Sequence, residues 1–477
     1  MSFNSTEYLI FLPVVLLIYW LLPYRGQNVL LLGASYFFLG YIHPWFLALI
    51  FTITLANYLC ALGMARKPQW RGRLMLAAAI ISLGILGTFK YADFFISNVA
   101  AVLTLLGLTS FTTTLDILLP VGISFYTFQA LAYTIDVHRG KLEPRANLLH
   151  IALFISFFPQ LVAGPIERAG HLLPQVENRR RVTPEGINQG LTLLVWGFFK
   201  KLVIADNAGL IAYKVFVLPD PGFPILWAGV WAFAIQILAD FWSYTDIARG
   251  SARLLGFSLS RNFDHPYLSR SPADFWRRWH MSLSYWLRDY VYIPLGGSQC
   301  PAGRSALNIM ATFLLSGLWH GASWNFVLWG GYHGLLILGE RVVRRVAGGI
   351  HLPRGRVAGG MIGGIQVLVT FGLVCIGWLM FRETDFSRLL ALALLDPWAA
   401  SVEDWHVAAY LAGLVLFYSL PLWIHGAIYT WDKQRRGPQP QYGRSLMLLR
   451  PVAASLLFLG ILVLKSPEPA TFIYFQF

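Results

Sequence analysis

Long apolar runs recur along almost the whole chain, and they decide what it can fold into. A helix needs about 20 apolar residues to cross a bilayer. The candidate runs are 8–23, 28–42, 45–63, 74–91, 117–133, 148–163, 187–205, 225–247, 306–339, 360–381, 406–424 and 448–464, with 93–110 as a weaker one. Charged residues make up only 13% of the chain, about half the share of a soluble domain. The sequence therefore predicts an all-α, polytopic membrane protein with about 11–13 transmembrane or re-entrant helices.

The basic residues gather between the apolar runs rather than within them. A net charge of +14 would suggest nucleic-acid binding in a soluble protein, but Lys and Arg between spans are typical of cytoplasmic loops. Basic clusters precede the runs at 74–91, 360–381 and 448–464, whereas acidic residues dominate 382–405. We therefore expect no nucleic-acid partner, an extracytoplasmic N-terminus and an extracytoplasmic tail at 465–477.

The run at 148–163 is not expected to cross the membrane from one side to the other. Basic residues at 139–145 and 179–181 flank it, so both of its ends are expected on the cytoplasmic side. Pro159 and the Gly-Pro pair at 164–165 also interrupt the segment. Such breaks are tolerated at membrane depth where protein or water covers the freed backbone groups. The sequence therefore predicts a re-entrant segment here.

Signatures of metals and resident cofactors are absent from the sequence. The three cysteines are far apart and form no CxxC pair, so neither a disulfide framework nor a thiolate metal site is expected. The sequence also has no HxxxH or HxxHH cluster, no P-loop, no GxGxxG turn and no GxSxG elbow. We therefore expect no bound metal ion, no permanently bound cofactor and no serine-hydrolase chemistry.

The stretch 261–300 has the aromatic content of a membrane interface but is too charged to span lipid. Ser271 is a typical N-cap residue, and Pro272 suits the first turn of a helix. The helix is expected to continue until Pro294 and the two glycines that follow it stop the pattern. His280 would then lie about 12 Å along the helix, at 1.5 Å per residue.

Two interpretations of this helix remain open, and they are compatible. In the first it is an interfacial helix whose tryptophans lie at headgroup level and whose Asp274 pairs with Arg278 at i,i+4. In the second, Arg277, Arg278 and Arg288 contact an anionic donor molecule, and His280 lies near the chemistry.

His320 lies inside the apolar run at 306–339, which is long enough for one tilted helix or a broken pair. Titratable residues within spans are rare and are candidates for function. Two glycine pairs with GxxxG spacing lie nearby: Gly317 with Gly321, and Gly330 with Gly334. Small faces let neighbouring backbones approach closely, so His320 is expected to face a protein interior. His333, about 220° further round a continuous helix, is expected to point elsewhere and to be structural.

Four runs, taken together and in this order, carry a resemblance to a known family. They are SFYTFQALAYTIDVHRG (124–140), FPQLVAGPIER (158–168), DFWRRWHMSLSYWLRDYVYIPLGG (274–297) and LWHGASWNFVLWG (318–330). The chain resembles the membrane-bound O-acyltransferase family. The spacing is similar to the bacterial branch with alginate O-acetyltransferases, peptidoglycan O-acetyltransferases and the D-alanyl transfer proteins of teichoic acid. The final FIYFQF at 472–477 resembles the tail of that branch.

The resemblance implies acyl transfer at two histidines along a tunnel through the membrane. The essential histidine of the WHG-like motif corresponds to His320, and the histidine of the RRWHxS-like motif corresponds to His280. O-acyl transfer needs a base for the hydroxyl proton, and an apolar setting favours the neutral imidazole that accepts one. His320 is therefore the expected base, and His280 is expected to orient a substrate or assist proton movement.

The resemblance also implies where the substrates and partners lie. The donor is expected to be a cytoplasmic acetyl thioester such as acetyl-CoA, and the chain is expected in a bacterial inner membrane, in contact with lipid. An exported polysaccharide lies on the other side, so a periplasmic acetyltransferase or another polysaccharide-modification protein is the expected partner. Tyr474 in the extracytoplasmic tail is either an acyl relay or part of a docking strand for that partner.

One membrane-embedded domain is expected over 1–477. Its parts are N-terminal helices at 1–110, a catalytic core at 111–340, and C-terminal helices with the tail at 341–477. The residues do not distinguish alginate, cellulose and peptidoglycan as the acceptor.

A transporter or flippase of a polysaccharide complex is the alternative function. Broken, glycine-rich spans and basic loops suit it equally well. The sequence shows no ladder of intramembrane acids for ion coupling, with Asp240 and Asp246 as exceptions near a span end. A scaffold subunit without chemistry of its own is a third reading, against which His320 argues.

Overall fold

A computed structural model shows an all-α chain, which confirms the predicted fold class. It describes residues 1–108, 115, 117–162, 164–346, 356–436, 444–468 and 470–473, and only the backbone of 356–359, 433–436 and 444–451. These described residues contain no β-strand. They form two compact units: unit 1 is Met1–Leu193 with Ile247–Ser260, and unit 2 is Leu194–Asp246 with Arg261–Phe477.

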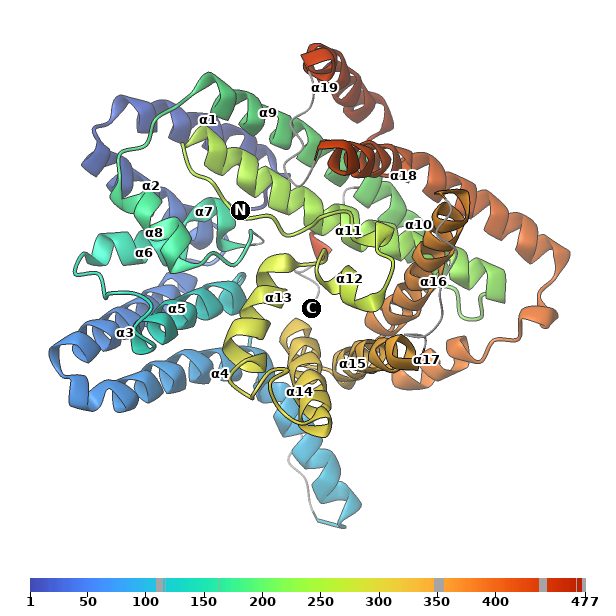
Figure 1. Ribbon diagram of the computed structural model, residues 1–477, viewed down its shortest axis with the longest axis horizontal. Helices are drawn as coiled ribbons and strands as arrows, with labels where there is room; N and C mark the ends of the chain where they lie inside the picture. The colour runs from blue at the N-terminus through green and yellow to red at the C-terminus, as the bar shows by residue number, and fades with distance from the viewer. Residues whose placement is uncertain are drawn as a thin grey trace. The chain divides into compact units, whose positions relative to one another are not determined.

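Unit 1 contains the N-terminal helices (Figure 1). These are α1 (Thr6–Leu21), α2 (Tyr24–Gly40), α3 (Phe46–Arg66), a 3₁₀ turn (Pro68–Trp70), α4 (Arg71–Leu105), α5 (Ile123–His138), α6 (Leu148–Ser156), α7 (Phe158–Leu161), α8 (Ala169–Glu177) and the first part of α9 (Pro184–Phe199). Helix α4 corrects one expectation, because the weaker run at 93–110 continues the helix of 74–91 instead of forming a separate span. Helix α6 has 9 residues, too few to cross a bilayer, which agrees with a re-entrant segment at 148–163.

Two buried charged side chains, Arg180 and Glu167, form hydrogen bonds with other segments of unit 1. Arg180 is only 9% exposed and donates hydrogen bonds to the Tyr19 hydroxyl at 2.9 Å and the Val176 carbonyl at 3.1 Å. The fully buried Glu167 accepts a hydrogen bond from the Ser260 amide at 2.5 Å. Its hydrogen bond with His171 also raises the pKa of that imidazole. Arg180, in the connection between α8 and α9, is thus a buried part of the fold.

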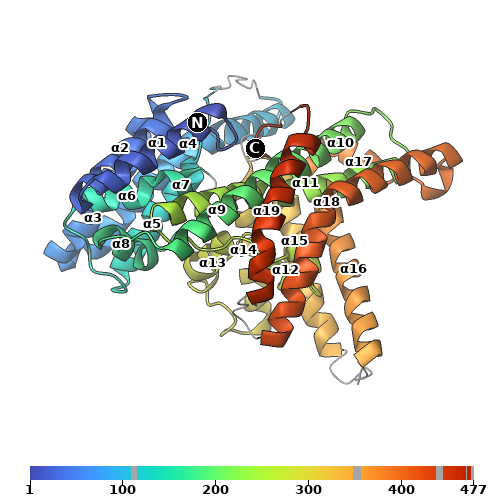
Figure 2. The same ribbon diagram turned by 90° about the horizontal axis from the view of Figure 1, so that it is seen from above.

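Unit 2 contains the end of α9 and the remaining helices, except that residues 247–254, the last two turns of α11, belong to unit 1. These are a π-helical turn (Lys200–Ala205), α10 (Asp206–Phe216), α11 (Phe223–Leu254), a 3₁₀ turn (Pro266–Leu268), α12 (Pro272–Trp276), α13 (Met281–Leu287), a π-helical turn (Arg288–Tyr292), α14 (Ala302–His320), α15 (Trp324–Val346), α16 (Arg356–Arg382), α17 (Phe386–Ala393), a 3₁₀ turn (Pro397–Ala399), α18 (Val402–Arg436) and α19 (Arg444–Leu464). Helices α15 and α16 run side by side (Figure 2).

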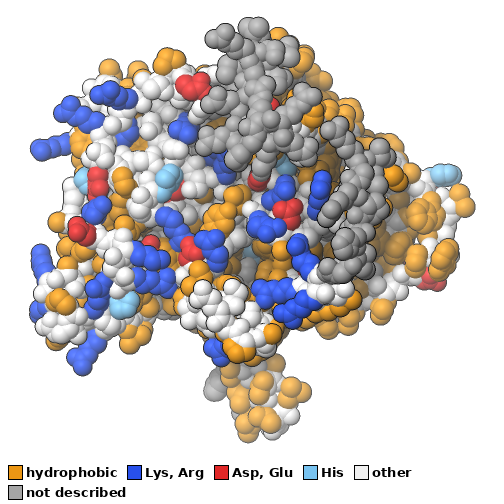
Figure 3. Space-filling view, viewed as in Figure 1, with side chains coloured by type: hydrophobic (Ala, Val, Ile, Leu, Met, Phe, Trp, Pro, Cys, Tyr) orange, Lys and Arg blue, Asp and Glu red, His pale blue; other side chains and the backbone are white. Residues whose placement is uncertain are grey.

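Five helices within the described residues are long and apolar enough to cross a membrane. They are Phe46–Arg66, Pro68–Leu105, Phe223–Leu254, Gly360–Arg382 and Val402–Asp432. On the face of the molecule drawn in Figure 3, Lys and Arg side chains are much more frequent than Asp and Glu. By length and composition, these helices agree with the predicted polytopic membrane protein.

Helices α14 and α15 touch through glycines, as the GxxxG spacing predicts. A Cβ atom on Gly317 would collide with the Phe326 carbonyl oxygen, and one on Gly330 would collide with the Phe313 carbonyl oxygen. Of the two forms expected for the run at 306–339, the structure shows the broken pair, because the helix ends at His320 and resumes at Trp324. This contact fixes the end of α14, and therefore His320, against α15.

Candidate active site

The expected helix over 271–294 begins as predicted but breaks early. The Ser271 hydroxyl caps it by accepting from the Asp274 amide at 3.2 Å, and Arg278 Nε lies 3.1 Å from Asp274. Helix α12, however, ends at Trp276, and α13 begins at Met281. The prediction of one continuous helix is therefore wrong, and His280 lies in the break.

The backbone at His280 turns through a conformation that non-glycine residues rarely adopt. Its φ angle is +41°, and the neighbouring loop contains a second such residue, His265, at φ +49°. A left-handed conformation costs an L-residue about 1–2 kcal/mol, so surrounding bonds have to hold it. The Met281 amide donates to the Asn262 carbonyl at 2.9 Å, and the Ser282 amide donates to Asn262 Oδ1 at 3.3 Å. Asn262 thus fixes the first turn of α13.

This turn carries the His280 ring into the interior of unit 2. His280 is fully buried, and its ring lies 4.7 Å from Phe241 of α11 and 5.7 Å from Trp319 of α14, centroid to centroid. Burial lowers the pKa of His280 to about 3. The ring is therefore neutral near pH 7, so it can accept or pass a proton but cannot hold a phosphate by charge.

His320 is the last residue of α14 and is surrounded by aromatic rings from three helices. It is 4% exposed, and its ring lies 4.9 Å from Trp319, 5.1 Å from Trp329 of α15 and 5.5 Å from Phe381 of α16. All three rings stand nearly perpendicular to the imidazole, at 76–86°. Edge-to-face contacts of this kind favour a defined ring orientation. The prediction that His320 faces a protein interior is confirmed.

The two predicted histidines are joined through one side chain. Trp319 contacts the rings of both His280 and His320. The structure therefore brings together residues that are 40 positions apart in sequence. His333 is also nearer than expected, because its ring lies 4.9 Å from Trp329, which contacts His320 as well. The angle expected for His333 assumed a continuous helix, and the break after His320 makes that angle invalid.

The three candidate arginines differ in how free they are to bind a donor. Arg277 has a side chain that is 67% exposed, and its nearest carboxylate, on Asp274, is 3.8 Å away. Arg278 is 26% exposed and more closely paired with the same carboxylate. Arg288 is 54% exposed and pairs with Asp289 at 2.8 Å. Arg277 is thus the most available cation, only three residues from the buried His280.

The chain's C-terminal tail returns to this part of unit 2. Phe472 is 1% exposed and stacks on Tyr244 at a centroid distance of 3.8 Å. It also lies 6.3 Å from Phe241, the residue that contacts His280. Tyr474, the predicted relay or docking residue, lies outside the described residues. The last residues described before it are therefore packed next to the neighbours of His280.

Two buried lysines in unit 2 escaped the sequence analysis. Lys200 Nζ lies 2.6 Å from Asp246, and Lys201 Nζ lies 2.9 Å from Asp240, with all four side chains at most 4% exposed. The available signal was the presence of adjacent lysines in one apolar run and two acids in another, since charges at membrane depth generally pair.

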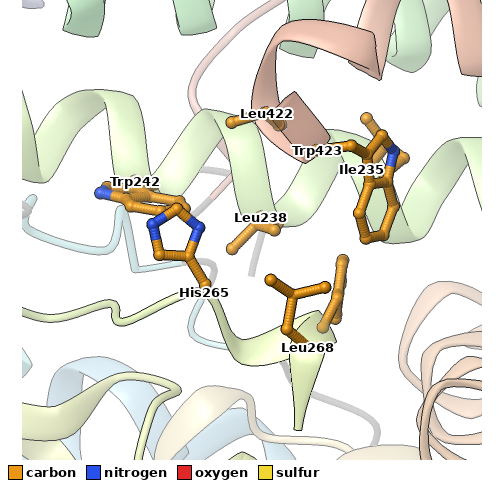
Figure 4. Close-up of a pocket in the computed structure, with 8 residues that line it drawn as sticks. Ile235, Leu238, Trp242, His265, Leu268, Leu422 and Trp423 are labelled. Carbon is orange, nitrogen blue, oxygen red and sulfur yellow. The ribbon is translucent and has the colours of Figure 1, made fainter. Parts of the chain in front are cut away.

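A small apolar cavity lies elsewhere in unit 2, beside His265 (Figure 4). Trp242, Tyr267 and Trp423 line it together with aliphatic side chains. His280 and His320 are not among its lining residues.

Comparison with known proteins shows the family to which this chain belongs. A sequence profile of the membrane-bound O-acyltransferase family matches residues 142–381, a range that includes both histidines. The chain is 36% identical to the probable alginate O-acetylase AlgI of Azotobacter vinelandii, over 100% of both chains. It is 32% identical to the peptidoglycan O-acetyltransferase of Helicobacter pylori, over 81% of this chain and 78% of that protein. It is 26% identical to the teichoic acid D-alanyltransferase of Bacillus subtilis, over 56% and 70% respectively.

Proposed function

Because the chain belongs to the membrane-bound O-acyltransferase family and is an O-acyltransferase enzyme of the membrane, we propose that it moves acetyl groups across the bacterial inner membrane. It takes acetyl from a cytoplasmic thioester, with acetyl-CoA as the donor, and passes it on for O-acetylation of an exported polysaccharide such as alginate. The observation that carries this proposal is the buried His320, which aromatic rings of three helices orient and which Trp319 joins to His280.

The chemistry at His320 is a direct acyl transfer. The neutral imidazole accepts the proton of the acceptor hydroxyl, and the oxygen of that hydroxyl attacks the thioester carbonyl. The new C–O bond forms, the C–S bond breaks, and the departing thiolate takes up the proton. His280, also neutral, assists this proton movement or orients the acceptor.

The donor's phosphates are held by arginine side chains. Arg277 is the first candidate because it is exposed and only loosely paired, whereas Arg278 is more closely bound to Asp274. Arg288 is a third cation of the same segment. Guanidinium groups bind phosphate through bidentate, charge-assisted hydrogen bonds.

The acetyl group leaves on the extracytoplasmic side through the tail. Tyr474 acts as the acceptor hydroxyl of the first transfer, and a periplasmic acetyltransferase then takes the group from the resulting ester to the polysaccharide. The packing of Phe472 against Tyr244 and near Phe241 supports this role, since Phe241 contacts His280. The names of the relatives, which include alginate and peptidoglycan O-acetyltransferases, support a polysaccharide acceptor.

The two intramembrane acids that favoured the transporter alternative are paired with lysines. Asp240 and Asp246, the acids that suited ion coupling, are paired with Lys201 and Lys200. Charges neutralised in this way are poor carriers of a coupling ion.

The test of the donor uses the purified protein in vesicles with its cytoplasmic face outward, supplied with radiolabelled acetyl-CoA. We expect label on the protein or its partner from acetyl-CoA but not from free acetate. Arg277→Ala should raise the KM for acetyl-CoA about tenfold with little change in kcat, since it removes one charge-assisted phosphate contact. Arg66→Ala, which removes an arginine from unit 1, is the control. No transfer from acetyl-CoA would refute the donor, and an unchanged KM would leave Arg277 as an interfacial residue.

His280→Asn tests the second histidine without straining the backbone, because asparagine tolerates the left-handed conformation. We expect a fall in polymer acetylation of about 10²-fold if the ring assists proton transfer. His265→Asn is the matched control, since His265 also has a positive φ, is 7% exposed and is absent from the neighbours of His320. Equal effects of the two substitutions on acetyl-ester content would contradict the role of His280.

A further inference from the structure

A buried charge cluster in unit 2 lies where the C-terminal tail enters the fold. Lys201 Nζ lies 2.8 Å from Asp206 and 2.9 Å from Asp240, and the three side chains are at most 2% exposed. Charges withdrawn from water have to be paired and hydrogen-bonded, because an isolated buried charge costs several kcal/mol. The cluster holds one cation and two carboxylates, so it requires further polar partners.

The tail supplies two of those partners from its own backbone. Lys201 Nζ donates a hydrogen bond to the Ala470 carbonyl oxygen at 2.9 Å. The Ile473 amide donates to the Asp240 carboxylate at 2.7 Å. Hydrogen bonds with one charged partner are roughly twice as strong as neutral ones. The backbone of the tail is thus hydrogen-bonded both to the cation, Lys201, and to a carboxylate, Asp240.

Two more bonds fix the start of the tail, one on the π-helical turn that contains Lys201 and one on α10, which follows it. Asn207 Nδ2 donates to the Leu464 carbonyl at 2.9 Å, and the Ser466 amide donates to the Leu202 carbonyl at 3.1 Å. Lys201 and Leu202 belong to the π-helical turn Lys200–Ala205. Such turns are frequent at functional sites, and this one places both lysines in the interior.

We propose that Lys201, Asp206 and Asp240 form a clamp that positions the C-terminal tail for acyl transfer. Lys201 and Asp240 are positioning residues, because they hold the backbone of residues 470–473 and leave the chemistry to His320 and Tyr474. This inference rests on the relay role of Tyr474 proposed above. It makes Phe472 and Ile473, which are both 1% exposed, the internal anchor of the tail.

The test compares two neighbouring lysines in the full chain. Lys201→Met removes the cation that holds the tail, whereas Lys200→Met removes an equally buried lysine whose carboxylate partner is Asp246 of α11. We measure the rate at which a broad-specificity protease cuts within residues 465–473 of the folded protein in detergent. Loss of a charge-assisted hydrogen bond predicts cleavage about ten- to hundredfold faster in Lys201→Met only. Polymer acetylation should fall with it, to the level of a chain truncated before Tyr474.

A second pair of variants leaves the charges in place, in case Lys201→Met does not fold. Ile473→Pro removes the amide that donates to Asp240, while Ile473→Ala removes more of the side chain than proline does and keeps the amide. The clamp predicts faster cleavage and lost acetylation for the proline variant alone. Wild-type cleavage in a folded Lys201→Met protein, or equal cleavage of the two Ile473 variants, would overturn it. A wrong relay hypothesis would give a different result: Tyr474→Phe would show normal acetylation while its tail stayed protected from the protease.

Discussion

Replacing His320 with alanine is expected to reduce acetylation of the exported polymer by about 10²–10⁴-fold, the usual cost of removing a general base. The imidazole is held by Trp319, Trp329 and Phe381, and none of these three side chains can accept a proton in its place. The measurement is the acetyl-ester content of polymer from cells that carry only the variant. The amount of the variant in the membrane is measured in parallel.

His333→Ala is the matched control for this experiment. His333 is 1% exposed, and its ring lies 4.9 Å from the same Trp329 that His320 contacts at 5.1 Å. Both substitutions remove an imidazole from one aromatic cluster and leave a cavity of similar size, so they should destabilise the fold similarly. Only His320→Ala should stop acetylation. Wild-type acetylation in His320→Ala, or equal losses in both variants, would remove His320 from the mechanism.

Local sequence signals predicted those parts of the site that depend on short-range interactions. Ser271 caps α12 and Asp274 pairs with Arg278 as expected, because both interactions span three or four residues. The close approach of α14 and α15 followed from the glycine spacing. Each of these features is set by helix geometry alone.

The break before α13 and the partners of the buried charges depend on tertiary interactions, which local sequence signals do not predict. The break at 277–280 contains no glycine or proline, and Asn262, from a separate segment, stabilises the positive φ of His280. Arg180 lies in a basic run that predicts a loop, and Lys201 lies in an apolar run, but their partners Tyr19 and Asp240 come from distant parts of the chain. Local sequence patterns do not identify partners so far away in the sequence.

Two variants of the tail, a truncation after Ile473 and Tyr474→Phe, distinguish a chemical role of Tyr474 from a docking role. A chain that ends at Ile473 keeps Phe472 on Tyr244 and the Ile473 amide on Asp240, and it removes only residues 474–477. We expect this truncation to abolish polymer acetylation whether the tail is a relay or a docking segment. Tyr474→Phe keeps the aromatic ring and removes only the hydroxyl, so it distinguishes the two roles.

If Tyr474 is the relay, Tyr474→Phe should lose acetylation as completely as the truncation, because the substitution removes the nucleophilic oxygen itself. A free tyrosine titrates near pH 10, so its oxygen needs a base such as His320 to attack at neutral pH. The relay therefore also predicts an acetyl ester on the tail of the wild-type enzyme incubated with acetyl-CoA, seen by mass spectrometry and removed by hydroxylamine. That ester should be absent from His320→Ala, whose tail is intact. Acetylation close to wild type in Tyr474→Phe would refute the relay and leave the tail as a docking segment, with His320 acting directly on another acceptor.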